Sequence, residues 1–303
     1  MREFRLLVTS ACNYNCFFCH KEGNMYLDLG RFLTAEDYEL LYKIGIDYFG
    51  FDTISVTGGE PLLRNDIIDI LSKLHTKGAK ITLTTNFSLY DKKKHSKLGT
   101  CLDKLNISLH SLDTQIYSQI IQSDIGSDLI CNKVRTFVKE NQNVKLGINC
   151  TVTKYNMSNE NIINLIKFVQ EIRGGINFSE IFTECKTEKI EISYVTNLIK
   201  KLGFQKNRIG ARSDEYFKDG VIVRISKILC ENAKKEKNAS DFCKNNRDLF
   251  ITPDGKIDIC REKNLNIDIY DDLKRKNIEK VLGKIRGAIN LLGDDCPMQY
   301  QYI

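Results

Sequence analysis

The sequence predicts an α/β fold in which parallel strands alternate with helices, as in an incomplete TIM-like barrel or a strongly curved sheet. Between residues 3 and 205, six short, nearly continuously apolar stretches alternate with stretches of helical periodicity. Such strands are typical of parallel sheets with helices covering both faces. Because six strands fall short of the eight in a closed barrel, we expect a partial (β/α)6 barrel.

The expected elements follow one another in order. Strands are expected at 3–10, 51–59, 80–86, 104–111, 144–153 and 176–182, and helices at 33–45, 64–78, 128–141, 159–174 and 192–204. Thr34 and Asn65 are the expected N-caps of the first two helices, since short polar side chains can bond the free amides there. These elements make residues 1–205 the expected barrel.

The pattern changes after residue 205, and residues 206–303 are expected to form a smaller domain. Residues 221–229 and 249–259 alternate in the manner of antiparallel strands, the second folded about Pro253-Asp254-Gly255. A Pro-Asp-Gly stretch between apolar runs favours a turn. Residues 237–248 between these strands are polar and are expected to be a loop.

The amino-acid composition and charge of the chain exclude some classes of function. The chain of 303 residues is 42% hydrophobic and 28% charged. It has no run of about 20 apolar residues, and its first residues do not resemble a secretory signal. We therefore expect a cytoplasmic protein without a membrane partner. The net charge of +6 is spread over short lysine groups, which indicates solvated helix faces rather than a nucleic-acid surface.

Cysteine use points to metal chemistry. Eleven cysteines are an odd number for a disulfide framework and many for a reducing compartment. Cys12, Cys16 and Cys19 have the spacing C-x3-C-x2-C. Three such thiolates could hold an iron–sulfur cluster with one iron left free of protein. They could also bind zinc together with His20, or be cysteines that hold no metal.

The ends of the expected strands gather the other candidate residues. Cys12, Gly58, Thr84 and Ser108 all lie at or just beyond a strand end. Active sites of barrels of this class lie at the carboxyl ends of the strands. We therefore expect these residues to share one functional face.

Two motifs together resemble the radical S-adenosylmethionine (SAM) superfamily. The cysteine motif has an aromatic residue, Phe18, before its last cysteine, and VTGGEP at 56–61 matches the family's Gly-Gly-Glu-Pro turn. The resemblance implies a 4Fe–4S cluster on Cys12, Cys16 and Cys19, with SAM bound at the open iron. It implies cofactor contacts for Phe18, Gly58, Gly59, Glu60, Thr84 and Ser108, most of them with SAM. It also implies an electron donor such as a flavodoxin or ferredoxin, and abstraction of hydrogen from a substrate by a 5′-deoxyadenosyl radical.

Five stretches spread over most of the chain carry a further resemblance: FRLLVTSACNYNCFFC, VTGGEPLLRNDI, LTTN, LNISLHSLD and FCKNNRDLFITPDGKIDIC. Together they are similar to the GTP 3′,8-cyclase family of molybdenum-cofactor biosynthesis. That family binds a second cluster through C-x2-C-x13-C; here Cys243 and Cys260 match the outer positions, and the middle one is Asn246. Cys230 and Cys296 are the nearby additional thiols. The resemblance implies an auxiliary iron–sulfur cluster in a twitch or SPASM-like C-terminal domain, with ligands among these four cysteines.

The basic residues expected for a triphosphate are largely missing. Where the cyclase family has Arg or Lys, this chain has Thr53, Ser55, Gly147, Asn177, Asp248 and Phe250. Only Arg5 remains, and a triphosphate needs several convergent cations. We therefore expect a peptide or small-metabolite substrate. The alternatives are the cyclase itself and a non-catalytic metal-binding protein.

His110 lies just beyond Ser108, where the cyclase family has an acid. It is a candidate for contacting the substrate. The alternative is a histidine whose hydrogen bonds are satisfied at the strand end.

Overall fold

The computed structural model describes residues 3–19, 30–181, 190–228, 230, 239–260 and 265–291. They fall into two compact units. The first comprises Met1–Cys12, Lys21–Leu83 and Leu229–Ile303, and the second comprises Asn13–His20 and Thr84–Ile228. The expected division into 1–205 and 206–303 differs from this one and stays a prediction.

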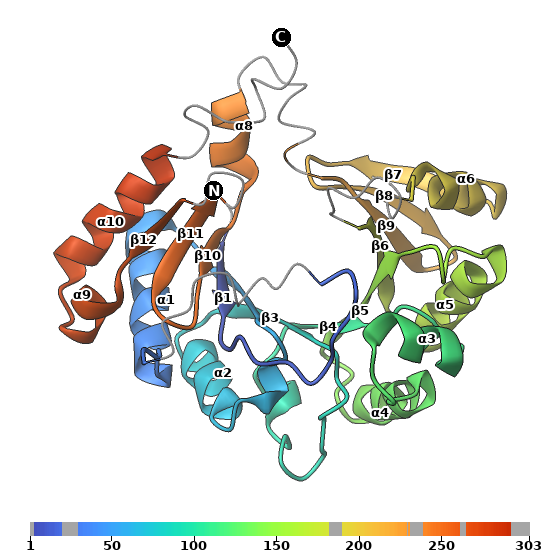
Figure 1. Ribbon diagram of the computed structural model, residues 1–303, viewed down its shortest axis with the longest axis horizontal. Helices are drawn as coiled ribbons and strands as arrows, with labels where there is room; N and C mark the ends of the chain where they lie inside the picture. Colours follow the sequence, from blue (N-terminus) through green and yellow to red (C-terminus); the bar gives the residue numbers. More distant parts are fainter. Residues whose placement is uncertain are drawn as a thin grey trace. The chain divides into compact units, whose positions relative to one another are not determined.

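The first unit is built on parallel strands extended by an antiparallel pair (Figure 1). Its strands are β1 (Phe4–Leu7), β2 (Thr53–Thr57), β3 (Lys80–Thr85, whose end belongs to the second unit), β10 (Leu249–Ile251), β11 (Lys256–Cys260) and β12 (Leu265–Asp268). Their order is β12-β11-β10-β1-β2-β3. β1, β2 and β3 are parallel, and β10 pairs with β1 in parallel. The expected antiparallel turn about Pro253-Asp254-Gly255 joins β10 to β11 and is confirmed.

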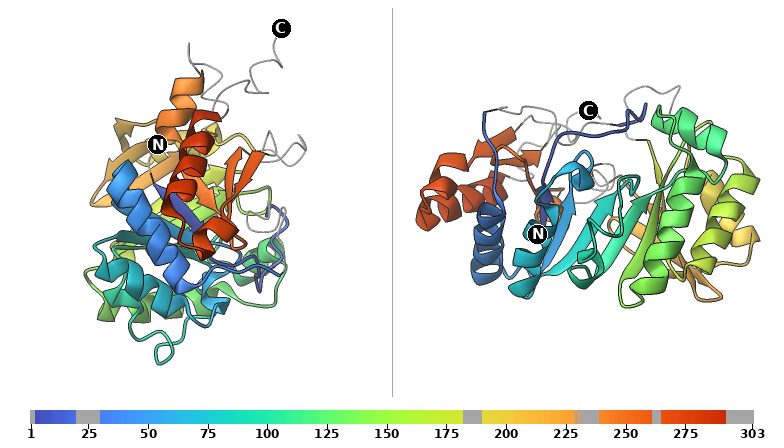
Figure 2. Two further views of the ribbon diagram at one scale, coloured as in Figure 1. Left: turned by 90° about the vertical axis from the view of Figure 1, so that its left-hand side faces the viewer. Right: turned by 90° about the horizontal axis from the view of Figure 1, so that it is seen from below.

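The helices of the first unit connect and cover these strands. They are α1 (Ala35–Phe49), η1 (Pro61–Leu63), α2 (Ile67–Thr76), α8 (Ala239–Asn246), α9 (Tyr270–Lys274) and α10 (Ile278–Leu291). Thr34 caps α1 as predicted, in a capping box with Asp37. Asn65 as the cap of α2 is wrong, because the helix begins one residue later, with Asp66 at the cap position. Figure 2 shows α9 beside α1, with which it is in contact.

The second unit repeats the parallel pattern and also ends in antiparallel strands. Its strands are β4 (Lys104–Ser108), β5 (Lys145–Val152), β6 (Gly175–Glu180), β7 (Gln205–Ile209), β8 (Ser213–Lys218) and β9 (Val221–Ser226). Their order is β4-β5-β6-β9-β8-β7. Its helices are η2 (Leu98–Thr100), α3 (Thr114–Ile121), α4 (Ser127–Glu140), α5 (Asn159–Glu171) and α6 (Ser193–Lys201).

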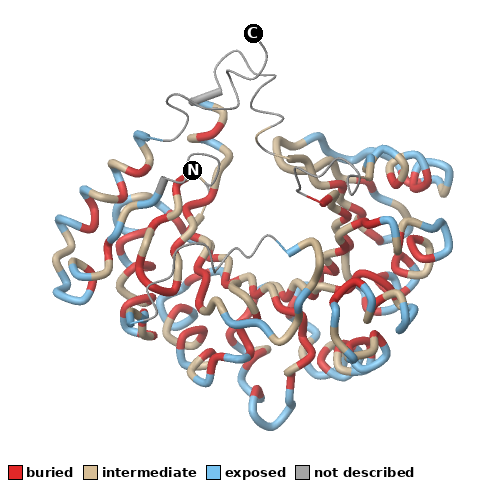
Figure 3. The backbone as a smooth tube through the Cα atoms, in the orientation of Figure 1, coloured by how far each residue is buried: buried red, intermediate tan, exposed pale blue. Residues whose placement is uncertain are grey.

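Two of the parallel strands, β2 and β4, bury one face rather than two. In β2 and β4, Ile54, Val56, Leu105 and Ile107 are fully buried, while the residues between them are partly exposed. Figure 3 shows the same alternation of buried and partly exposed residues along the tube. The predicted α/β fold class with parallel strands is confirmed, but the expectation that helices cover both faces is wrong. The partly exposed face carries Thr53, Ser55 and Thr57 in β2, and Lys104, Asn106 and Ser108 in β4.

The helices were also compared with the length and apolar character of a membrane-spanning helix. Among the described residues, no helix combines the length and the apolar character needed to cross a bilayer.

Candidate functional site

The loop after β1 carries the three cysteines of the first motif. Cys12 and Cys19 are exposed and Cys16 is partly exposed, so none of them is a buried core thiol. Cys19 N donates a hydrogen bond to Cys16 O at 3.0 Å, which closes a turn. Within the described ranges, no three His, Cys, Asp or Glu residues are grouped as metal ligands. Ligation by Cys12, Cys16 and Cys19 therefore stays a prediction, and three accessible thiols on one short loop are a donor set that fits it.

The second unit holds the cysteine loop through its backbone and its aromatic rings. Asn15 N donates to Ile121 O at 3.0 Å, at the end of α3. The Phe17 ring lies edge-on to Tyr155, with centroids 5.5 Å apart, and the Phe18 ring lies edge-on to His110 at 5.0 Å. The conformation of this loop is thus stabilised by residues other than its cysteines.

In the first unit, the Gly-Gly-Glu turn binds the backbone just before Cys12. Gly59 N donates to Thr9 O and Glu60 N to Ala11 O, both at 2.8 Å. A Cβ on Gly58 would lie 2.4 Å from Thr9 O, and one on Gly59 would lie 2.2 Å from Ala11 O. Neither position can therefore hold a side chain without moving the strand end. The glycines are required by this close approach.

The carboxylate of Glu60 has a structural partner in addition to its predicted role. The residue is fully buried, and its Oε1 accepts the Leu62 N–H at 2.9 Å, which caps η1. A buried carboxylate is stabilised by such N–H groups. Its contact with SAM stays a prediction.

Arg64, for which sequence reasoning found no role, links β1 to its neighbours. Its Nη1 donates to Val8 O at 2.7 Å, its Nη2 donates to Leu33 O at 2.6 Å, and its Nε donates to Asp66 at 2.6 Å. The guanidinium also lies over the Phe32 ring, 4.0 Å from the centroid. Arg64 thereby satisfies a carbonyl at the strand end that leads into the cysteine loop. The only signal in the sequence was its place directly after the Gly-Gly-Glu-Pro motif.

A second set of residues missed in the sequence holds Asn13, the residue after Cys12. Asn13 Nδ2 donates to Ser88 Oγ, and Asn86 Nδ2 donates to Asn13 Oδ1, both at 2.9 Å. Asn86 and Ser88 are buried in the turn that follows β3. Asn86 is the last residue of the strand expected at 80–86, so its place at a strand end was the available signal.

Thr84 and Ser108 lie where the sequence predicted them, near the ends of β3 and β4. Both are partly exposed, and neither hydroxyl forms a hydrogen bond with another described residue. The hydroxyls are therefore available to a ligand, as the predicted SAM contacts require. The contacts themselves stay predictions.

His110 is buried beneath Phe18 and kept neutral. Its Nδ1 accepts the Thr151 N–H at 3.2 Å, so the ring proton is on Nε2. Its carbonyl accepts a hydrogen bond from Asn156 Nδ2 at 2.8 Å. Burial lowers the pKa of His110 to about 4. His110 is thus a neutral N–H donor next to the cysteine loop, and its contact with a substrate stays a prediction.

The C-terminal cysteines are placed on α8 and β11. Cys243 is buried in α8, which occupies part of the stretch 237–248 that was expected to be a loop; that expectation is wrong. Cys260 ends β11 and is partly exposed, as is Cys230. Asn246, at the position of the missing middle cysteine, donates its Nδ2 to Phe242 O at 2.9 Å. Cys296 lies outside the described residues.

Arg5 is the one basic residue left at the positions where the cyclase family has Arg or Lys. It is bound by Asp248 and Phe250, which occupy two of those positions. Its Nη2 lies 3.1 Å from Oδ2 of Asp248, whose side chain is fully buried. Its guanidinium lies 5.1 Å from the centroid of the Phe250 ring. Arg5 of β1 is aligned with Phe250 of β10 in the strand register. The single cation is thereby neutralised within its own unit.

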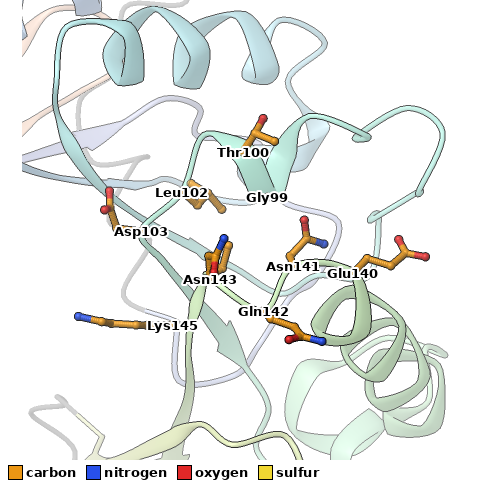
Figure 4. Close-up of a pocket in the computed structure, with 10 residues that line it drawn as sticks. Gly99, Thr100, Leu102, Asp103, Glu140, Asn141, Gln142, Asn143 and Lys145 are labelled. Carbon is orange, nitrogen blue, oxygen red and sulfur yellow. The ribbon is translucent and has the colours of Figure 1, made fainter.

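A cavity of the second unit lies at the opposite, amino end of its strands (Figure 4). It has a volume of about 400 Å³ and is lined by Gly99, Thr100, Leu102, Asp103, Glu140, Asn141, Gln142, Asn143, Val144 and Lys145. Asp103 precedes β4 and Lys145 begins β5. The predicted site residues lie at the carboxyl ends of the strands, so this cavity is not their site.

Comparison with known families gives one match of wide extent. The family model described as the radical SAM superfamily matches residues 6–169. This range contains the cysteine motif, the Gly-Gly-Glu turn, Thr84, Ser108 and His110.

Curated relatives are similar over nearly the whole chain. A probable GTP 3′,8-cyclase of Pyrobaculum aerophilum is 29% identical over 95% of this chain and 93% of its own length. A probable GTP 3′,8-cyclase of Sulfurisphaera tokodaii is 29% identical over 96% of this chain and 91% of its own.

Solved structures show the same fold. Streptococcus suis SuiB bound to S-adenosylmethionine has a TM-score of 0.65 at 18% identity, over 96% of this chain and 69% of its own. Native anSMEcpe with bound AdoMet has a TM-score of 0.57 at 15% identity, over 86% of this chain and 74% of its own.

Proposed function

Because this chain belongs to the radical SAM superfamily, its cofactors are a 4Fe–4S cluster and SAM, and we propose that it abstracts hydrogen from a peptide or small metabolite other than GTP. In the proposal, Cys12, Cys16 and Cys19 hold the cluster and leave one iron for SAM. When bound, such a cluster would supply the electron that cleaves SAM to methionine and the 5′-deoxyadenosyl radical.

The chain's own residues orient this pair. The amides of Gly59 and Glu60 hold Thr9 and Ala11 just ahead of Cys12, and Arg64 holds Val8. These contacts set the course of the loop before any cofactor binds. A prearranged ligand loop avoids an ordering cost when cluster and SAM bind.

The observation that carries the choice of substrate is the state of Arg5. A triphosphate carries several negative charges, and its site needs Arg or Lys donors that are not already neutralised. Asp248 and Phe250 engage Arg5. To bind a phosphate, Arg5 would have to leave a fully buried carboxylate, which is costly.

The other replaced positions support the same choice. Ser55 stands at a position where the cyclase family has a basic residue, and its Oγ donates to Glu3 Oε1 at 2.6 Å. A carboxylate therefore lies next to this position. Asn177 Oδ1 accepts from Ser226 Oγ at 2.8 Å. None of these side chains brings a positive charge. An uncharged or weakly charged substrate fits them better than GTP.

The second candidate is GTP 3′,8-cyclase. The names of the curated relatives favour it, and their similarity extends over nearly the whole chain. It requires GTP to bind without the basic residues described above.

A test with GTP separates the two candidates. The protein is reconstituted anaerobically with iron and sulfide, reduced with dithionite, and given SAM with and without saturating GTP. We expect the same slow formation of 5′-deoxyadenosine in both. An increase of about tenfold or more with GTP, together with a GTP-derived product, would overturn our choice of substrate.

The electron donor and the compartment are part of the proposal. A flavodoxin or ferredoxin in the cytoplasm would supply the electron, because free thiolates and a reduced cluster need a reducing compartment. Replacing dithionite by a reduced flavodoxin should support formation of 5′-deoxyadenosine. Failure of every flavodoxin and ferredoxin tried would contradict this part.

A further inference from the structure

The chain between β3 and β4 contains a basic loop, residues 91–97, which we call the lysine loop. The helix α2 joins β2 to β3, and α5 joins β5 to β6, whereas β3 and β4 are joined only through this loop and η2. Asp91 is the only acidic residue of the loop. Its exposed cations are Lys92, Lys93, Lys94 and Lys97. The lysine loop is thus an exposed segment of positive charge, and the proposed function leaves it without a role.

The lysine loop is held by its own backbone and by a buried histidine. Asp91 Oδ1 accepts the Lys94 N–H at 2.7 Å, and Asp91 O accepts the His95 N–H at 2.8 Å. The His95 side chain is buried, and its ring stacks on Tyr90 with centroids 6.0 Å apart. Tyr90 in turn stacks on Phe87 at 4.5 Å. Because the base of the loop is packed, its lysines face solvent as a set.

Three of the four lysines have no counter-charge within ion-pair distance. Lys92 Nζ pairs with Glu140 Oε1 at the end of α4. Lys93, Lys94 and Lys97 form no ion pair with any residue that the structure describes. Neighbouring charges of one sign attract a surface of the opposite sign and speed its encounter. The loop therefore fits an acidic partner.

The same connection also reaches the cysteine loop. Asn13, the residue after Cys12, is held by Ser88 Oγ and by Asn86 Nδ2, both at 2.9 Å. Four peptide units separate Ser88 from Lys92, so their Cα atoms lie within about 14 Å of each other. A protein bound to the lysine loop would therefore be close to the segment that follows Cys12.

We propose that the lysine loop is the docking surface for the protein that delivers the electron, and that this partner presents an acidic surface around a one-electron redox group. The proposal rests on the proposed function, because a protein without a cluster needs no electron carrier. In the docked complex, the reduced carrier is oxidised by one electron and the cluster on Cys12, Cys16 and Cys19 is reduced by one. Exposed charges raise the rate of encounter more than the affinity, which suits a carrier that must leave after each transfer.

A nucleic acid is the other macromolecule that lysines could attract. Four cations neutralise few phosphates, and binding through few phosphates is weak at physiological salt. Binding to single strands also uses exposed aromatic rings on which bases stack. The only ring within the lysine loop is that of His95, which is buried. The loop therefore fits an acidic protein better than a nucleic acid.

The test compares two reductants in one variant. Lys93→Glu/Lys94→Glu/Lys97→Glu reverses the unpaired charges, and formation of 5′-deoxyadenosine from SAM is followed with dithionite or with a reduced flavodoxin of net negative charge. With dithionite the rate should equal that of the wild type, since a small reductant needs no docking surface. With flavodoxin at low salt, the apparent kcat/KM for flavodoxin should fall about tenfold or more. The difference should largely disappear in about 1 M salt, where the Debye length is about 3 Å.

The matched control makes the same change of net charge elsewhere. Lys43→Glu/Lys167→Glu/Lys280→Glu alters three exposed lysines, one each on α1, α5 and α10. It should lower the flavodoxin-driven rate far less than the loop variant does. Circular dichroism and iron counts check that both variants are folded and loaded.

Binding gives a second readout that does not depend on radical chemistry. The fluorescence anisotropy of a labelled flavodoxin should show weaker binding to the loop variant than to the wild type and the control variant. If the proposed function failed, the wild type would form no 5′-deoxyadenosine even with dithionite, and this binding measurement would still decide the docking surface.

Several outcomes would overturn the proposal. These are equal losses in the loop and control variants, or an unchanged flavodoxin-driven rate and unchanged binding in the loop variant. A loss of the dithionite-driven rate in the loop variant would assign the lysines to the catalytic site instead. Binding of a short oligonucleotide at physiological salt that only the loop variant loses would assign them to a nucleic acid.

Discussion

Gly59 shows at the scale of one residue why the Gly-Gly-Glu turn needs glycine. Its amide bonds Thr9 O, and its Cα faces the Ala11 carbonyl so closely that a Cβ would lie at 2.2 Å. The neighbouring atoms are backbone atoms and cannot rotate away. The turn and the cysteine loop are therefore fitted to each other at this residue.

Gly59→Ala should destabilise the protein by about 2 kcal/mol or more, because the strand end must shift to relieve the clash. Urea unfolding measures this change, and iron content should fall as the cysteine loop moves. Gly283→Ala in α10 is the matched control, since nothing lies within 4 Å of its added methyl group. It should stabilise the protein by about 0.5 to 1 kcal/mol. Equal effects of the two changes would contradict the close fit at Gly59.

The buried His110 predicts how the free energy of unfolding depends on pH. Its pKa of about 4 in the folded protein lies below the ordinary 6.5, so the unfolded chain takes up the proton first as the pH falls. The free energy of unfolding should therefore decrease from about pH 6.5 to pH 4, by about 3 kcal/mol over the range from this residue. Above pH 6.5, His110 should cause no change.

Urea unfolding from pH 4 to pH 8 tests this prediction. His110→Gln should show a weaker decrease than the wild type, since glutamine can still accept the Thr151 N–H but does not titrate. His75→Gln, at an exposed site of α2, is the control. Parallel curves for His110→Gln and the wild type would refute the assignment.

For single residues, the sequence allowed predictions only where a local motif or a strand end marked the position. Cys12, Gly58, Thr84 and Ser108 were singled out from spacing and strand ends, and their roles stay predictions. Arg64 and Asn86 were missed because their partners lie far away in the chain or belong to backbone groups, which no local pattern records.

At the scale of elements, β10 shows what periodicity cannot determine. The hairpin of β10 and β11 was predicted from its turn, but alternation of apolar residues does not reveal which strand lies next to a hairpin. The structure pairs β10 with β1 in parallel, and only then do Asp248 and Phe250 meet Arg5. The helix α8 was missed because KNASDFCKNN has too few apolar residues to show a helical stripe.

The ion pair between β1 and the residue before β10 can be tested by a double-mutant cycle. Arg5→Leu should cost about 3 kcal/mol, because it removes the cation next to a fully buried carboxylate. Asp248→Leu added to Arg5→Leu should recover much of this loss. Denaturant unfolding gives the four free energies, and additivity of the two single changes would show that the pair is not coupled.

At the scale of the whole molecule, the sequence predicted the class of fold better than its details. The six parallel strands with intervening helices were found, since each βα unit has its own periodicity. Helix cover on both faces was expected, but in β2 and β3 Thr or Ser alternates with Ile, Val or Leu, which leaves one face of these strands partly exposed. β7 and β8 were missed because they are polar strands, the first exposed along its whole length and the second mostly half-buried.

The most direct test of the central claim is formation of 5′-deoxyadenosine from SAM by the anaerobically reconstituted, dithionite-reduced protein. The account predicts that the wild type forms it together with methionine, and that Cys16→Ala lowers the rate by about a hundredfold or more, because the cluster that binds SAM is lost. Cys131→Ala should keep the wild-type rate. Absence of 5′-deoxyadenosine from a wild-type protein with a full complement of iron and sulfide, or an equal rate in Cys16→Ala, would contradict the account.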